Sequence, residues 1–144
     1  ANLLRDRVGV FHVTDDSELL ARAAVDRLEL PPHFAAIADF PVPRLQDTCR
    51  WYAFRVAAVD SSQQRVRFDC QVVSHGTVRD FLGFNRAKHA VIEAAILATR
   101  LHLLPPQEID QELSRLRIIV EKTAGPREFA AFAVLEQFVR ESRT

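Results

Sequence analysis

One predicted helix start carries side chains that are suited to binding an anion. Asn85 is a residue type favoured at helix N-caps, and Arg86 and Lys88 follow in the first turn with His89. Backbone N–H groups point outward there and the helix dipole is already positive, so each cation costs roughly 0.3–1 kcal/mol. A bound phosphate would offset that cost. The pattern therefore indicates a phosphate site at Asn85, Arg86 and Lys88.

A structural explanation without a ligand accounts for the same pattern. The cations can meet carboxylates of a neighbouring element, or they can lie on a solvated stripe, because Arg86, His89 and Glu93 share one helical face. The same stripe favours a solvated or ion-paired Glu93 over a buried general base. The sequence leaves the two explanations open.

Helical spacing of apolar residues predicts the elements that carry this site. A helix is predicted over 85–104, where Pro105 ends it, and two more helices over 106–120 and 126–140. An earlier helix over 17–27 is predicted to begin with a capping box of Asp15 and Glu18. The C-terminal half is therefore expected to be helical.

The N-terminal half shows strand patterns. Alternating runs predict a strand over 7–13 and a long hairpin over 48–75, whereas the prolines between residues 30 and 45 predict a loop or a single helical turn. Pairing Ala58 with Val66 would place Cys70 opposite Phe54 on the apolar face and turn Cys49 away from it.

The cysteines are therefore predicted to be two free thiols in a reducing compartment, with Cys70 in the core. His12 is expected to be a hydrogen-bonded core histidine. For Trp51 and Tyr52, packing against neighbouring side chains is favoured over stacking on a cofactor ring.

Composition excludes several classes of protein. With 144 residues, of which 48% are hydrophobic and 26% charged, the chain can build one ordinary globular core. Nineteen basic and nineteen acidic residues cancel, which argues against nucleic acid as a partner. No apolar run approaches the roughly 20 residues that cross a bilayer, so a cytoplasmic location without membrane contact is expected. The start at Ala1, without a methionine, suggests a fragment that lacks upstream residues.

Motifs for catalysis or metal binding are missing from the sequence. The five histidines and two cysteines lack metal-ligand spacing, so no metal site is expected. Four scattered glycines cannot build a P-loop or a dinucleotide fingerprint, and no serine lies in a nucleophile elbow. Catalytic residues therefore stay unassigned.

Four strings carry a resemblance to a known family: VTDD at 13–16, WYAFRV at 51–56, the run from Gly83 to Leu104, and RLRIIVEKTAGPRE at 115–128. They resemble domain-of-unknown-function family 447, which belongs to the FMN-binding split-barrel superfamily. The resemblance implies an α+β fold, with an FMN-binding split β-barrel that is incomplete in this chain and a C-terminal three-helix bundle. Residues 1–77 would form the barrel domain and residues 78–144 the helical domain.

The resemblance also implies a cofactor and a partner. FMN would be bound by a homodimer, with Asn2 at the end of the flavin-phosphate segment and Thr14 at the strand end beside it. Asn85, Arg86 and Lys88 lie in the family's signature string, and their assignment to the phosphate rests on the helix start described above. The leading hypothesis is a flavin-dependent oxidoreductase linked to methanopterin-dependent one-carbon metabolism, acting on a small molecule that the sequence does not identify. The alternative is a non-enzymatic flavin- or ligand-binding or assembly module.

Overall fold

The computed structural model describes residues 2–29 and 31–143, which divide into two compact units. The sheet unit comprises residues 1–14 and 32–81, and the helical unit comprises residues 15–31 and 82–144. The chain thus leaves the sheet unit early, contributes one helix to the helical unit and returns. The expected division after residue 77 differs from these units mainly in that early helix.

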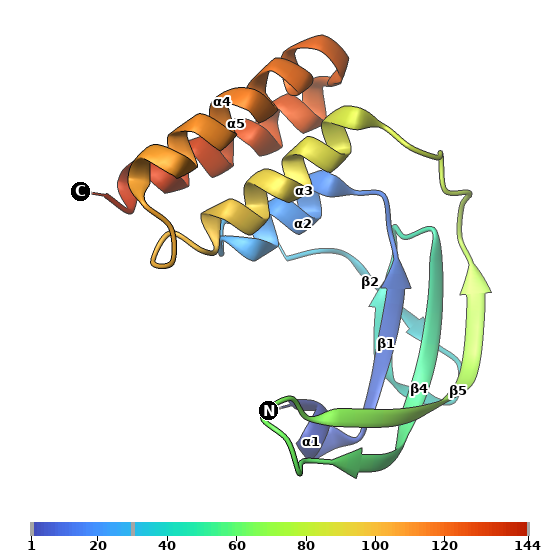
Figure 1. The fold of residues 1–144 in the computed structure, drawn as a ribbon. Coiled ribbons are helices and arrows are strands. Elements are labelled where there is room, and N and C mark those ends of the chain that lie inside the picture. The colour runs from blue at the N-terminus through green and yellow to red at the C-terminus, as the bar shows by residue number, and fades with distance from the viewer. Residues whose placement is uncertain (1, 30, 144) are drawn as a thin grey trace. The chain divides into compact units, whose positions relative to one another are not determined.

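The sheet unit contains two antiparallel sheets. The first has the strand order β1-β4-β5, so that β4 lies in the middle (Figure 1). The second is the hairpin β2–β3. The elements are α1 (Asn2–Asp6), β1 (Val8–Val13), β2 (Phe34–Ile37), β3 (Phe40–Leu45), β4 (Arg50–Asp60) and β5 (Arg67–Thr77). The predicted first strand and long hairpin are confirmed.

The hairpin β2–β3 corrects the prediction of a loop between residues 30 and 45. Asp39, with φ of 55°, makes the tight turn, which is a conformation that Asp tolerates better than most residues. The prolines at positions 41 and 43 lie outside the paired positions of the short ladder. A strand with one neighbour in its sheet tolerates them because half of its N–H groups need no strand partner.

The register of β4 and β5 also differs from the prediction. Val56 pairs with Cys70 and Phe54 pairs with Val72, two residues from the predicted partners. The ladder has two irregularities, after Ala53 and after Val56. Beyond each of them, toward the strand ends, the partners lie one residue further from the predicted register. The prediction used the alternation of apolar residues on both sides of a polar loop. Neither the alternation nor the loop specifies where a bulge occurs, so the predicted partners were wrong.

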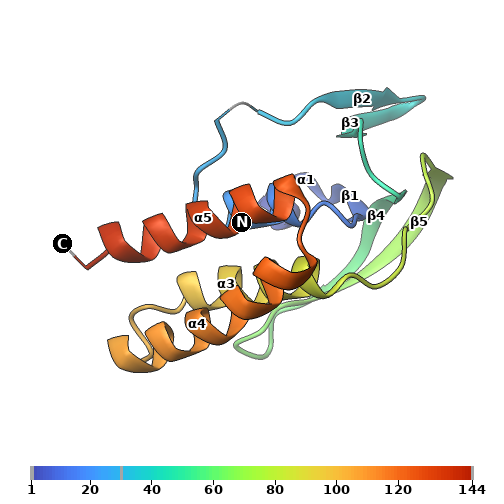
Figure 2. The ribbon, with the colours of Figure 1, turned by 90° about the horizontal axis from the view of Figure 1, so that it is seen from above.

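Four helices form the helical unit: α2 (Ser17–Ala24), α3 (Arg86–Ala98), α4 (Pro106–Thr123) and α5 (Pro126–Glu141). The four predicted helices are confirmed, although α2 and α3 end earlier than predicted. Figure 2 shows α3, α4 and α5 running alongside one another. Pro106 and Pro126 each occupy the first turn of a helix, where their missing N–H groups have no intrahelical partner to lose.

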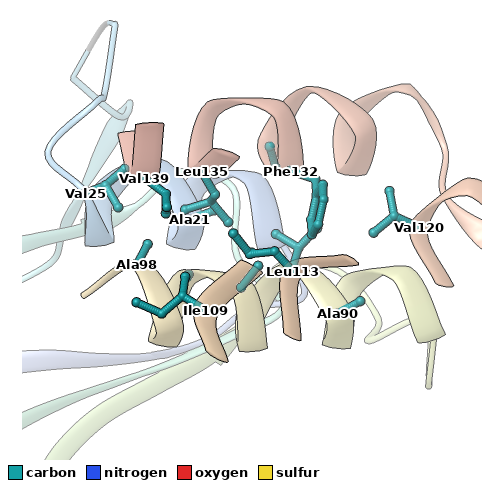
Figure 3. Close-up of a cluster of buried hydrophobic side chains, with 14 residues drawn as sticks. Ala21, Val25, Ala90, Ala98, Ile109, Leu113, Val120, Phe132, Leu135 and Val139 are labelled. Atoms are coloured by element: carbon teal, nitrogen blue, oxygen red, sulfur yellow. The ribbon is translucent and has the colours of Figure 1, made fainter. Parts of the chain in front are cut away.

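The core of the helical unit combines small and large side chains (Figure 3). The buried face of α3 is mostly alanine, which lets the larger Ile109 of α4 and Leu135 of α5 pack closely against it. Ala21 and Val25 bring α2 into the same cluster. The chain therefore has a mixed α+β fold with five helices and two sheets among the described residues.

Candidate functional site

The start of α3 has the predicted cap. Asn85 has an extended backbone, and its side-chain oxygen accepts a hydrogen bond of 3.1 Å from the backbone N–H of Lys88. Acidic residues are absent from the first turn of this helix. One of the outward-pointing N–H groups of α3 is thereby satisfied by the chain itself.

Lys88 has a carboxylate partner within the helical unit. Its ammonium nitrogen lies 3.2 Å from a carboxylate oxygen of Asp15, whose side chain is 3% exposed. The side chain of Lys88 is 26% exposed, so the pair is largely shielded from water. This carboxylate offsets the cost of a cation at the helix start, as the structural explanation of the sequence pattern requires.

Acidic side chains at the start of α2 also pair with a basic residue in the first turn of α5. Arg127, in the first turn of α5, donates hydrogen bonds of 2.7 Å to Asp16 and 3.1 Å to Glu18. These bonds hold the pKa of Arg127 above its ordinary value. Asp16 is also the N-cap of α2, since its side chain accepts from the backbone N–H of Leu19 at 3.0 Å. The prediction that Asp15 caps this helix was therefore wrong by one residue.

Arg86 differs from Lys88 in its surroundings. It is the first residue of α3 and is exposed. Within the part of the chain that the structure describes, no carboxylate forms an ion pair with Arg86. The neighbouring His89 stacks on Phe84, with ring centroids 5.7 Å apart, and Phe84 is 93% exposed. An anion could approach the helix start beside Arg86 from solvent.

Asn2 and Thr14 both lie in the sheet unit. Asn2 is the first residue of α1, and Thr14 follows the last residue of β1. The strand β1, which separates the two residues in the chain, has six residues and is roughly 17 Å long. Asn2 thus precedes β1 and Thr14 follows it, and their assignment to the flavin-phosphate site stays a prediction. Asn85, Arg86 and Lys88 share one helix turn in the other unit.

A polar cluster near the end of β1 was missed by the sequence analysis. Thr48 is completely buried, and its hydroxyl donates 2.9 Å to the carbonyl of Val13. Arg79 donates 2.8 Å to Asp47 and 3.2 Å to the sulfur of Cys49. Arg79 is 32 positions from Asp47 and 30 positions from Cys49 in the sequence. No spacing in the sequence indicates these contacts.

The cysteines occupy the reverse of their predicted environments. Cys49 is 1% exposed, whereas Cys70 is exposed on the strand β5. Both are free thiols. Because Arg79 donates to the Cys49 sulfur, this thiol lies in an electropositive environment, but its burial keeps reagents away.

The aromatic residues of β4 lie on opposite faces of the sheet. The guanidinium of Arg44 lies 5.9 Å from the ring centroid of Trp51, and the same ring covers Gly76. Tyr52 lies between Phe11, at 6.5 Å, and His75, at 6.1 Å between ring centroids. Both side chains pack against neighbours, as the favoured interpretation predicted.

Among residues 2–29 and 31–143, no cluster of histidine, cysteine and acidic side chains could hold a metal ion. The described helices are also too short or too polar to span a membrane.

Comparisons with known proteins identify the family. The N-terminal domain model of the protein of unknown function DUF447 matches residues 1–79, and the second DUF447 model matches residues 85–137. No curated protein matches the chain. The crystal structure of an FMN-bound DUF447 protein from Methanosarcina mazei has a TM-score of 0.80 and 22% sequence identity, and the match covers 95% of this chain and 74% of that one. This likeness shows a shared fold. Since the N-terminal model alone matches more than half of the residues, the chain belongs to the DUF447 family of proteins of unknown function.

Proposed function

We propose that the protein binds FMN and uses it in an oxidation or reduction of a small molecule. The observation that carries the proposal is the shared fold with the FMN-bound protein from Methanosarcina mazei, which extends over 95% of this chain. Membership of the same family supports the transfer. The proposed fold in detail is a split β-barrel followed by a helical bundle.

The start of α3 fits a flavin phosphate in part. Arg86 is exposed and stands where a phosphate oxygen could accept from its guanidinium and from the first backbone N–H groups of the helix. Lys88 would have to share its ammonium with Asp15, so a direct contact from this residue is less favourable. Asn85 would orient the helix through its cap. For Asn2 and Thr14, the proposal rests on family resemblance alone.

FMN supplies hydride and electron transfer when it is bound, and the protein's part is to bind and orient it. A flavoprotein of this kind needs no acid–base triad, which agrees with the unassigned catalytic residues. The proposal includes a role in methanopterin-dependent one-carbon metabolism, on the resemblance alone. A non-enzymatic ligand-binding or assembly module is the alternative.

The proposed assembly is a homodimer in the cytoplasm. The sheet β1-β4-β5 exposes large apolar side chains, with Phe11 60% exposed and Val72 50% exposed. Apolar surface of this kind on a sheet is typical of an interface. Sedimentation of the purified protein should report two chains per particle, and a monomer at micromolar concentration with flavin bound would contradict this part of the proposal.

Absorbance and titration test the flavin. The purified protein should take up FMN, show the visible flavin absorption and lose it when NADH or NADPH is added. A protein that remains colourless and does not bind added FMN would contradict the proposal. If the protein binds FMN but neither NADH nor NADPH reduces the bound flavin, the result would favour the non-enzymatic alternative.

Riboflavin gives a matched control for the phosphate site, because it lacks only the phosphate. Losing one charge-assisted hydrogen bond costs about 1.5–3 kcal/mol, which is roughly a 10- to 100-fold loss of affinity. Arg86→Met should therefore weaken FMN binding by this factor and leave riboflavin binding unchanged. Equal losses for both ligands would exclude Arg86 from the phosphate site.

A further inference from the structure

A histidine joins the two sheets of the sheet unit. The backbone N–H of Leu45, in β3, donates a hydrogen bond of 3.0 Å to the Nε2 atom of His12, in β1. A histidine nitrogen accepts a hydrogen bond only when it carries no proton. The contact therefore exists only with neutral His12, whose remaining ring proton must lie on Nδ1.

The direction of the Leu45 N–H follows from the pairing of β3 with β2. The next N–H along the chain belongs to Gln46, which directly follows β3, and it donates a hydrogen bond of 2.8 Å to the carbonyl of His33. Alternate N–H groups of an antiparallel strand point in opposite directions, so the N–H of Leu45 points away from β2. Without His12 it would be an edge donor with no strand partner. The histidine thus replaces a ladder hydrogen bond between β3 and β1.

The charged groups around His12 disfavour its protonation. Arg44 faces it from β3, and partial burial together with this cation holds the pKa of His12 below the ordinary value of 6.5. On β4 the residue paired with His12 is Trp51, and Arg55 lies on the same face by strand alternation. Arg55 is held over the ring of Phe40 at 5.7 Å. The Arg44 guanidinium is positive, so it opposes a second proton on the imidazole.

We propose that His12 is a proton-sensitive latch, which holds β3 of the hairpin β2–β3 against β1 when neutral and releases β3 when doubly protonated. Protonation converts the Nε2 acceptor into a donor that faces the N–H of Leu45. The two donors then repel each other, and Arg44 gains a cationic neighbour. Because Arg44 lies over Trp51, release of β3 also uncovers that ring.

The chain contains a single tryptophan, so its fluorescence reports on this contact. Lowering the pH from 8 through the range below about 6.5 should shift Trp51 emission to the red in one step. In the same step, hydrogen exchange corrected for intrinsic rates should show about a tenfold fall in the protection of the Leu45 amide. Unchanged emission and unchanged protection over this range would overturn the proposal.

Two histidine variants separate the latch from general acid effects. His12→Gln offers a neutral oxygen acceptor that cannot titrate in this range, so emission and Leu45 protection should stay constant with pH. His75→Gln removes an exposed histidine beside Tyr52 on the other face of the sheet and should keep the wild-type transition. A transition that persists in His12→Gln, or disappears in His75→Gln, would refute the assignment.

A measurement on the unmodified protein keeps the proposal testable if a variant does not fold. NMR titration of the His12 imidazole should give the same midpoint as the loss of Leu45 amide protection. It should also show the Nδ1-protonated tautomer at high pH. Different midpoints, or a proton on Nε2 at high pH, would rule out the latch.

Discussion

Replacing the two basic residues at the start of α3 one at a time should produce opposite changes in stability. Lys88→Met removes the partner of a carboxylate that is 3% exposed, whereas Arg86→Met removes an exposed cation from the positive end of a helix. Methionine keeps the length and helix propensity of both side chains. The comparison therefore isolates the two charges.

The expected magnitudes follow from the exposure of each group. Exposed ion pairs contribute about 0–1 kcal/mol, and breaking a fully buried pair costs about 3–5 kcal/mol. The pair of Lys88 with Asp15 lies between these limits because Lys88 is 26% exposed, so its loss should cost about 1–3 kcal/mol. Relief of the helix dipole returns roughly 0.3–1 kcal/mol in either variant. Lys88→Met should thus lower the free energy of unfolding by about 1–2 kcal/mol, and Arg86→Met should raise it slightly.

Urea unfolding followed by far-ultraviolet circular dichroism measures both changes, because the signal comes mainly from the helical unit. Asp15 has contacts besides Lys88, so Asp15→Asn alone would mix several losses. A double-mutant cycle of Asp15→Asn with Lys88→Met isolates the pair, and a coupling of about 1–2 kcal/mol is expected.

The opposite result has a clear meaning. If Lys88→Met is as stable as the wild type in the absence of ligand, and FMN affinity falls 10- to 100-fold, then the ammonium serves the ligand rather than Asp15. A coupling energy near zero would lead to the same conclusion. Equal destabilisation by both substitutions would show that the first turn depends on side-chain packing and not on charge.

Two further predictions concern the sheet unit. In the folded protein, a thiol reagent should modify Cys70 rapidly and Cys49 only after unfolding, and the reverse order would contradict their burial. Gly76→Ala would place a Cβ atom 2.8 Å from the Trp51 ring, so stability should fall by about 1–3 kcal/mol with a change in tryptophan emission. Gly83→Ala, with φ of 89° and no neighbour within 4 Å, should leave that emission unchanged.

The sequence by itself determined the elements whose signals are local. Asn85 caps α3, Pro106 and Pro126 begin the next helices, and apolar spacing marks the face of each helix that is buried. These signals act within one or two turns of chain, so no distant contact is needed to produce them. The long hairpin β4–β5 belongs to the same class, because its strands are neighbours in sequence. The string around α3 was also specific enough to indicate the family, which the family models confirm.

Only the tertiary structure decided the features that depend on distant residues. Bulges fixed the register of β4 and β5, and a one-residue change in register turns a side chain to the other face of the sheet. Packing buried Cys49 and left Cys70 exposed. Lys88 at the start of α3 meets Asp15, which lies 73 positions earlier in the chain, and a local sequence pattern cannot predict that contact. A charge pattern shows that a partner is needed, and the fold determines which partner is there.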